Sequence, residues 1–280
     1  MDLYDLRCVS ASWIGAEIAS SNARIRNIAQ RKSARWLDDA FFEIVRCLNT
    51  TGFIECGARD ASASRRFLRE GGRRAVALEA NQPTYEQKTK HAEDDGVIAL
   101  NAGVGPRDGE FLDFFVPASH STASNASLRQ KPGVAAHAQR VISRSIDAIS
   151  SAYFAEDNTA LWVDVEGMAF DVFQGAETAL AEQQITAIKV EVETSELWQG
   201  QHLAGAVDAQ LQKNGYCPVL CDFEYREQFN VIYVRSSARD MLDPTLRSRQ
   251  FSMRECRPTR LERLFKSRNY PWRKVPRTNI

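Results

Sequence analysis

The sequence predicts a single α/β domain whose core is a doubly wound, mostly parallel β-sheet. Its 280 residues, 44% of them hydrophobic, are enough for one large core with at most a small appendage. From residue 51 onward, short apolar segments alternate with polar segments of helical character. Such alternation is typical of parallel sheets with helices on both faces. Charged residues make up 26% of the chain, the level of an ordinary folded protein.

The region 51–235 contains the segments that read as strands and helices. The strand candidates are Phe53–Cys56, Ala75–Leu78, Val97–Leu100, Phe111–Val116, Val141–Ile146, Leu161–Asp164, Ala187–Val192 and Phe229–Val234. The helix candidates are Ser62–Glu70, Pro83–His91, Ala169–Glu182 and Leu203–Asn214. Because strand–helix–strand crossovers are right-handed, this order fixes most of the topology.

The two ends of the chain differ from this region. Residues 1–50 are predicted to form a helical segment, because apolar residues recur at helical spacing before the break at Asn49–Gly52. We expect a helix over 12–48 to cap the sheet or a ligand cleft. Residues 236–280 are predicted to be a basic tail, since 13 Lys and Arg against 4 Asp and Glu over 235–280 give a net charge of +9. From Asp240 the tail lacks apolar periodicity, so we expect it to lie outside the core.

Composition also limits the class of protein. No apolar run approaches the roughly 18 residues of a membrane span, and the acidic start Met1–Asp5 is not a signal peptide. None of the six cysteines forms a C-x-x-C pair, so we expect free thiols and no metal. The chain is predicted to be cytoplasmic. The basic tail raises the alternative that the chain acts on nucleic acid, although such charge more often serves solubility or membrane-surface contact.

A glycine turn follows the first strand of the region. The segment Phe53–Cys56 ends at Gly57, and a helix begins at Ser62. A glycine lets the backbone amides approach a ligand closely, and open α/β sheets bind ligands beyond the carboxyl ends of their strands. Glu79 ends the next strand, 22 residues after Gly57, where a carboxylate is expected to bind a ribose diol. The simpler alternatives are that Gly57 only forms an ordinary turn and that Glu79 is a solvated charge at the end of a strand.

The spacing of glycines separates two classes of nucleoside cofactor. Gly57 is the only glycine between Phe53 and Glu70, so a G-x-G-x-x-G pattern is absent. A pyrophosphate needs close approach of the backbone at more than one point. A nicotinamide dinucleotide is therefore disfavoured. S-adenosylmethionine fits better, because it carries an amino-acid end where a dinucleotide carries phosphates.

Two carboxylates follow the strand Leu161–Val163. Asp164 and Glu166 precede a helix and are expected at the carboxyl edge of the sheet. Carboxylates suit a cationic sulfonium cofactor, and one of them is a candidate general base for a hydroxyl. The alternative is that one of them only caps the following helix, which would stabilise the fold by about 1 kcal/mol.

The series of motifs over residues 51–235 resembles the FkbM family of S-adenosylmethionine-dependent methyltransferases. The matching segments are Glu55–Ser64, Glu79–Asn81, Asn101–Gly105, Asp164–Gly167 with Val172, Gly175 and Ala176, and Val190–Glu193. The resemblance implies a class I methyltransferase fold: a Rossmann-like doubly wound sheet of about seven strands, the last antiparallel, with an N-terminal helical cap. It further implies O-methylation of a hydroxyl on a sugar, glycan or secondary metabolite.

The resemblance also implies roles for individual residues. Glu55, Gly57 and Ala58 would shape the cofactor loop, and Glu79 would bind the ribose. Asn101 and Ala102 would border the adenine. Asp164 and Glu166 would line the crevice where the methyl donor and the acceptor meet.

Three positions depart from the family pattern. Ala61 stands at a family glycine, Trp162 at a common basic residue, and Ala169 at a usual acidic residue. These departures leave open the alternative of a non-catalytic relative that acts as a partner of glycan enzymes.

Two further side chains are candidates for the acceptor site. His120 lies in a polar, Ser-rich segment and is chemically suited to act as a general base, although surface loops hold most such histidines. Trp198 is expected either to form a wall of the acceptor site or to anchor a helix.

Overall fold

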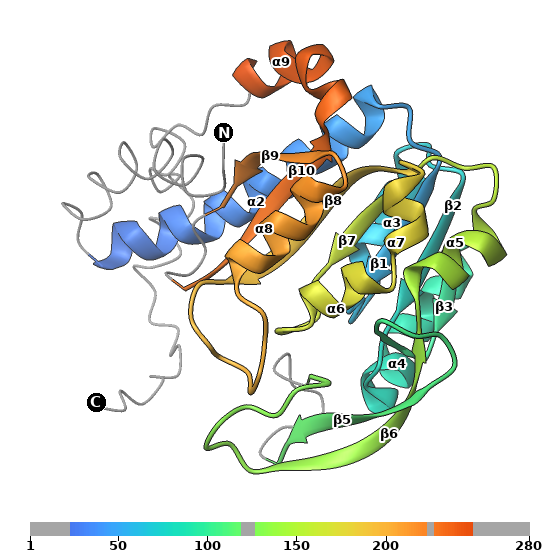
Figure 1. Cartoon of the computed structure of the whole chain (residues 1–280), viewed down its shortest axis with the longest axis vertical. Helices are drawn as coiled ribbons and strands as arrows, with labels where there is room; N and C mark the ends of the chain where they lie inside the picture. The colour runs from blue at the N-terminus through green and yellow to red at the C-terminus, as the bar shows by residue number, and fades with distance from the viewer. Residues whose placement is uncertain (1–22, 119–126, 223–226, 249–280) are drawn as a thin grey trace, which may run out of the picture.

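The computed structural model describes residues 23–118, 127–222 and 227–248 of the chain. These residues form a three-layer α/β/α structure around a seven-stranded sheet with a smaller three-stranded sheet at one end (Figure 1). The strands of the large sheet are β1 (Gly52–Cys56), β2 (Arg74–Leu78), β3 (Ile98–Leu100), β7 (Thr159–Val163), β8 (Ile185–Glu193), β9 (Tyr216–Cys221) and β10 (Gln228–Arg235).

The large sheet has the strand order β3-β2-β1-β7-β8-β10-β9. Neighbouring strands from β3 to β8 are parallel, whereas β10 pairs antiparallel with both β8 and β9. The order reverses at β1, where one half of the sheet runs outward to β3 and the other to β9. A doubly wound sheet binds its ligands at this kind of reversal. The predicted fold class and the antiparallel last strand are confirmed.

Alternate residues of the strands build two hydrophobic layers, one on each face of the sheet. Ile54, Leu161 and Ile188 belong to one layer, while their neighbours Phe53 and Ala160 belong to the other. The first layer is covered by α5 (Ile146–Tyr153), α6 (Ala169–Gln174), α7 (Glu177–Ala181) and α8 (Ala204–Lys213), which lie in front in Figure 1. The second is covered by α2 (Ala23–Cys47), α3 (Ser62–Arg69) and α9 (Arg239–Ser248).

Helix α2 covers the sheet through an aromatic stripe. Phe42 stacks on Phe53 of β1 with ring centroids 6.0 Å apart, and Phe41 meets Trp162 of β7 edge-on at 5.7 Å. Leu37, Ile44 and Val45 recur at helical spacing on the same buried side. Of the helix expected over 12–48, the part from Ala23 to Cys47 is described, and residues 1–22 lie outside the described residues.

The second sheet extends away from the first at the lower edge of Figure 1. Its strands β4 (Gly103–Val104), β5 (Phe111–Pro117) and β6 (Ala136–Arg144) are ordered β4-β6-β5, with β5 and β6 antiparallel. Two strand candidates thus belong to a separate sheet. The expectation that a strand continues to Ile146 is wrong, because Ser145 caps α5 by accepting from the amide of Ala148 at 3.2 Å.

The start of the basic tail is folded. Helix α9 follows the short 3-10 turn η2 (Ser236–Ala238), and the side chain of Leu242 is fully buried in the layer that α2 covers. The expectation that the chain from Asp240 lies outside the core is therefore wrong at Leu242. Residues 249–280 of the tail lie outside the described residues. A truncation after Val234 would expose apolar surface on α2 and β9.

Other local differences have local causes. The helix expected from Pro83 is the short α4 (Gln82–Gln87), which is followed by the 3-10 helix η1 (Thr89–Asp95). The helix expected over 169–182 is divided into α6 and α7 at Gly175, where an added Cβ would lie 2.3 Å from the carbonyl oxygen of Gly105. Within the described ranges, no helix combines the length and apolar character of a membrane span. None of the cysteines in the described ranges is in a disulfide, and Cys56 and Cys221 are buried.

Candidate functional site

Three strands of the large sheet end at the same level on its carboxyl edge. Cys56 of β1 pairs in register with Leu78 of β2 on one side and with Val163 of β7 on the other. The next residue of each strand is therefore a neighbour of the other two. These residues are Gly57, Glu79 and Asp164. The sequence motifs that follow the three strands thus converge on one edge.

The turn at Gly57 requires a glycine. Its φ is +78°, and a Cβ at this position would lie 1.8 Å from the carbonyl oxygen of Asp164. The amides of Gly57 and Ala58 both donate to the carbonyl of Leu78, at 3.0 and 2.8 Å. The amide of Asp164 donates to the carbonyl of Cys56 at 3.0 Å. The backbone at Gly57 therefore packs directly on the backbone at Asp164, with no room for a side chain between them. This contact and the hydrogen bond hold the ends of β1 and β7 together.

The Glu79 carboxylate holds the same turn from the other side. One oxygen accepts from the amide of Arg59 at 2.9 Å and the other from the amide of Asn81 at 2.8 Å. Glu79 is 8% exposed. Burial raises its pKa, and the two backbone hydrogen bonds oppose that rise. The simpler alternative of a solvated charge is therefore wrong, and Glu79 contributes to folding as well as being a candidate ligand residue.

Glu55 is a buried carboxyl beneath the turn. One of its oxygens accepts from both the amide and the hydroxyl of Ser64, at 2.8 and 2.5 Å. Burial raises the pKa of Glu55 to about 7, and the hydrogen bonds from Ser64 limit the rise. Ala61, between them, adopts the left-handed conformation with φ 54° and ψ 33° at the start of α3. It thus keeps the conformation for which a glycine is favoured.

A cleft of about 450 Å³ opens above these residues. Its lining includes four predicted site residues, Glu55, Gly57, Ala58 and Asp164, and three basic side chains. It also includes Asp38 of α2 and Trp162 of β7, which were not predicted. The N-terminal helix therefore forms one wall of the cleft, as expected for a cap.

Asp164 lines this cleft, and its side chain is exposed to the solvent that fills the cleft. Displacement of water by the surrounding protein raises its pKa, and the positive charge of Lys189 opposes the rise. Lys189 is buried on β8, with its ammonium 3.1 Å from Asp38 and 3.6 Å from the centre of the Trp162 ring. A ligand that fills the cleft removes water from Asp164, so a positively charged ligand is favoured there.

A second group of carboxylates lies beside Asp164, on β8 and on the turn after β7. We call Asp164, Glu166, Glu191 and Glu193 the acidic cluster. The Gln228 side-chain amide donates to Glu191 at 2.7 Å and to Glu166 at 3.3 Å. Burial and the Asp164 charge raise the pKa of Glu166 to about 8. Burial raises the pKa of Glu193 to about 7 and that of Glu191 well above its usual range.

The acidic cluster therefore shares protons near neutral pH, because its carboxylates repel one another and are partly shielded from water. Glu193 is 2% exposed, and one of its oxygens accepts from the side-chain amide of Gln201 at 3.2 Å. Throughout the described ranges, no group of three or more His, Cys, Asp or Glu is arranged to hold a metal ion.

The remaining predicted residues are spread around this edge. Asn101 follows β3, and its side-chain amide donates to the Glu79 carbonyl at 2.8 Å, so it borders the glycine turn. Ala102 is buried beside it. His120 lies outside the described residues. Trp198 is buried in the loop between β8 and α8, against Gly167.

Several residues of the site were given no role from the sequence, and their signal in it is weak. Lys189, Glu191 and Glu193 alternate with Val190 and Val192, which points the charged side chains to one face of β8. Gln228 enters the cluster through its register with Glu193 on the antiparallel strand β10. No local pattern indicates that pairing. Asp38 is one of two adjacent acidic residues of α2, and the sequence gives no local signal that Asp38 and not Asp39 faces the cleft.

Comparison with known proteins places the chain in a family. The model of the methyltransferase FkbM domain matches residues 55–218. Because this match covers more than half of the 280 residues, the chain belongs to the FkbM methyltransferase family. No curated protein matches the sequence.

Solved structures of methyltransferases are similar at low identity. Magnesium protoporphyrin IX methyltransferase from Synechocystis PCC 6803, with bound SAM, is 10% identical at a TM-score of 0.43, covering 78% of this chain and 86% of that one. The 1,6-didemethyltoxoflavin-N1-methyltransferase of Burkholderia thailandensis is 14% identical at a TM-score of 0.38, covering 81% and 85%.

Proposed function

We propose that this chain is an S-adenosylmethionine-dependent methyltransferase that methylates a hydroxyl group of a sugar, a glycan or a secondary metabolite. The observation that carries the proposal is the convergence of Gly57, Glu79 and Asp164 on one edge of the sheet, at the reversal of strand order. Family membership supports methyl transfer as the reaction. The cofactor is inferred from the chemistry of the residues at the glycine turn, whereas the acceptor class is what the resemblance to the FkbM family implies.

The residues at the glycine turn fit this cofactor. Glu79 uses one lone-pair direction on each oxygen for a backbone amide, so each oxygen can still accept from a ribose hydroxyl. Asp164 offers a negative charge beside the cleft, which suits a sulfonium. A second glycine that would cradle a pyrophosphate is absent from the sequence of the turn. When bound, the cofactor supplies an electrophilic methyl group.

The chain's own residues would then bind and orient the two reactants and accept a proton from the hydroxyl. Lys189 favours the charged form of Asp164, whereas Asp164 in turn favours the protonated form of Glu166. A carboxyl with a pKa near 8 is matched to neutral pH, so Glu166 or a neighbour in the cluster is suited to accept a hydroxyl proton during methyl transfer. Holding donor and acceptor in line and excluding water supplies most of the acceleration.

Two of the three departures from the family pattern are compensated. Ala61 adopts a left-handed conformation, which a glycine reaches at no steric cost. Trp162 replaces a basic residue, but Lys189 lies opposite it in register on β8 and brings its ammonium over the indole ring. Nothing in the structure explains the third, Ala169, which is buried in the core. These compensations favour an active enzyme over a non-catalytic relative.

The proposal is tested by methyl transfer from isotopically labelled S-adenosylmethionine to a panel of sugars, oligosaccharides and hydroxylated metabolites. We expect mass spectrometry to detect methyl ethers in at least one acceptor class. Incorporation into nitrogen or into RNA, with none into hydroxyls, would contradict the O-methylation. Cofactor binding without transfer to any acceptor would favour the non-catalytic alternative.

A further inference from the structure

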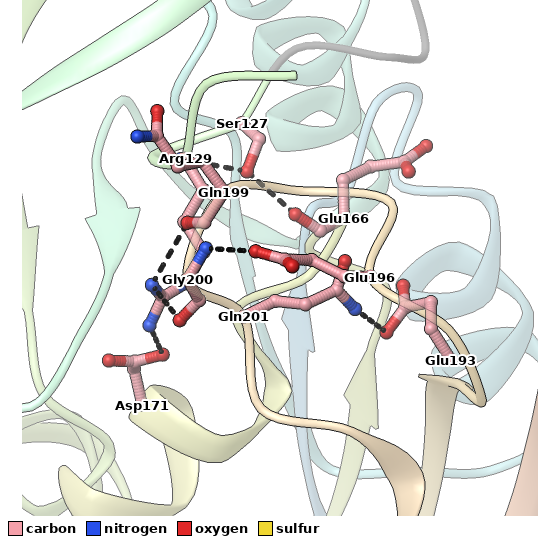
Figure 2. Close-up of polar contacts among 9 residues, drawn as sticks. All are labelled: Ser127, Arg129, Glu166, Asp171, Glu193, Glu196, Gln199, Gly200 and Gln201. Atoms are coloured by element: carbon pink, nitrogen blue, oxygen red, sulfur yellow. Dashed lines mark hydrogen bonds and ion pairs between the residues drawn. The ribbon is translucent and has the colours of Figure 1, made fainter. Parts of the chain in front are cut away.

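The segment Ser127–Lys131, which we call the strap, crosses the acidic side of the sheet edge. It is fixed to β5 by two backbone hydrogen bonds between Ser127 and Phe115, at 2.7 and 3.1 Å. From there it contacts the turn after β7, helix α6 and the loop between β8 and α8. Figure 2 shows these contacts converging from three separate parts of the chain.

Ser127 holds the backbone of Glu166. Its buried hydroxyl donates to the Glu166 carbonyl at 2.6 Å and accepts from the amide of Arg129 at 3.0 Å. Glu166 has a positive φ of 47°, which costs a residue with a side chain about 1–2 kcal/mol. A backbone in that conformation persists only when its surroundings hold it. The direction of the Glu166 carboxyl group therefore depends on the Ser127 hydroxyl.

Arg129 holds the loop after β8. Its guanidinium donates to the Gly200 carbonyl at 2.6 Å and pairs with Asp171 of α6 at 2.8 Å. Figure 2 shows the guanidinium between these two partners. The side chains of Arg129 and Asp171 are 19% and 16% exposed, so this pair is better shielded than an ordinary surface ion pair.

The loop held in this way carries a contact to the acidic cluster. Gly200 donates its amide to Glu196 at 2.8 Å, and the next residue, Gln201, donates its side-chain amide to Glu193 at 3.2 Å. The strap also approaches Trp198, with the Lys131 ammonium 5.0 Å from the centre of the indole ring. Arg129 is thus connected to Glu193 through the loop after β8. Ser127 is connected to Glu166 directly, through the Glu166 carbonyl.

We propose that Ser127 and Arg129 are positioning residues that hold Glu166 and Glu193 in place as the acceptor-side wall of the active site. The assignment of that wall to the methyl acceptor rests on the proposed methyltransferase function. Neither Ser127 nor Arg129 lines the cleft at the glycine turn. The strap therefore orders the acidic side without touching the residues assigned to the cofactor.

The first experiment needs neither cofactor nor acceptor. Carbon-13 NMR of the glutamate carboxyl groups is titrated in the full chain, with signals assigned through Glu166→Gln and Glu193→Gln. We expect Ser127→Ala to lower the pKa of Glu166 from about 8 and Arg129→Ala to lower that of Glu193 from about 7. The expected shift is about one pKa unit or more, because a loosened wall admits water to a carboxyl whose pKa is raised by burial.

Two variants serve as controls. Ser127→Thr keeps the hydroxyl and should retain the high pKa of Glu166. Arg140→Ala removes an arginine from β6 in the same small sheet, where it is 66% exposed and 3.9 Å from Asp113; it should shift neither carboxyl. If Ser127→Ala and Arg129→Ala lower only the melting temperature and move neither pKa, the strap is merely structural and the proposal is overturned. An equal shift in Arg140→Ala would also overturn it.

The second experiment tests whether the strap acts on the acceptor side of the site and not on cofactor binding. With an acceptor identified, both strap variants should lower kcat/KM for the acceptor by about 10²-fold, the scale of a 1 Å misplacement, with an unchanged dissociation constant for S-adenosylmethionine. An equal loss of cofactor affinity would contradict the division of roles. If the unmodified chain does not bind the cofactor, the proposed function fails, while the NMR titration still decides the positioning claim.

Discussion

The carboxyl edge of the sheet has two halves, which supply hydrogen bonds to their carboxylates in different ways. We call the half with Glu55, Gly57 and Glu79 the glycine half, and the half with Glu166, Glu191 and Glu193 the acidic half. In the glycine half, Glu79 accepts from two backbone amides and Glu55 from Ser64. In the acidic half, Glu166 and Glu191 share one side-chain amide of Gln228. Backbone donors are fixed by the fold, whereas side-chain donors and neighbouring carboxylates can rearrange. The glycine half is therefore built for rigid binding, and the acidic half for a charge that responds to pH and to ligands.

The largest effect of a single substitution is expected at Gly57. Gly57→Ala places a Cβ at 1.8 Å from the Asp164 carbonyl and strains a positive φ. We expect it to lower the free energy of unfolding by about 3 kcal/mol or more, from steric overlap and backbone strain together. It should also abolish cofactor binding.

Gly109→Ala is a matched control. Gly109 has a φ of +76°, close to that of Gly57, and an added Cβ would meet nothing within 4 Å. It should cost only the backbone strain, about 1–2 kcal/mol. Equal costs for the two variants in urea unfolding would mean that the close approach of Gly57 to Asp164 is not what requires the glycine.

The next largest effect is expected at Asp164, which lies between the two halves. Asp164→Asn removes the charge but keeps the backbone bond to Cys56, so the melting temperature should change little. If the charge stabilises the transition state, turnover should fall by about 10²-fold or more. Asp113→Asn on the small sheet is the control. Normal turnover together with a lowered melting temperature would assign Asp164 a structural role.

Much of the glycine half could be predicted from the sequence because its residues follow adjacent strands that are near in the chain. Glu55, Gly57 and Glu79 lie within one strand–helix–strand unit, and right-handed crossover places their strands side by side. The acidic half joins Glu166, Glu191 and Gln228 with a strap that begins at Ser127. These contacts depend on the register of an antiparallel strand and on loop packing, for which the chain carries no local pattern.

The acidic half should make stability depend on pH. Glu191 has a folded-state pKa well above the usual 4.5. The folded chain therefore holds this proton more tightly than the unfolded chain, and stability is lost as pH rises from about 4.5 through the raised value. Glu191→Gln removes that loss and should be more stable than the unmodified chain at pH 8 by about 1 kcal/mol or more.

Urea unfolding at pH 5 and pH 8 measures this difference, with the exposed Glu86→Gln as control. The stability gain of Glu191→Gln should appear at pH 8 and vanish toward pH 5. A gain of the same size at both values would mean that Glu191 is not protonated in the folded chain.

The smallest effect is expected at Ala61. Glycine would relieve the left-handed strain of about 1–2 kcal/mol, but it adds chain entropy to the unfolded state and removes a buried methyl group. Ala61→Gly should therefore change stability by less than about 1 kcal/mol and leave cofactor affinity unchanged. A large gain in affinity, measured by calorimetry, would show that Ala61 impairs the turn.

Calorimetric titration of the chain with S-adenosylmethionine and with NAD tests the proposed cofactor. We expect binding of S-adenosylmethionine and none of NAD. Glu79→Gln should weaken that binding by about 1.5–3 kcal/mol, the worth of a charge-assisted hydrogen bond, while Glu86→Gln leaves it unchanged. Binding of NAD with no binding of S-adenosylmethionine, or an unchanged affinity in Glu79→Gln, would contradict the account.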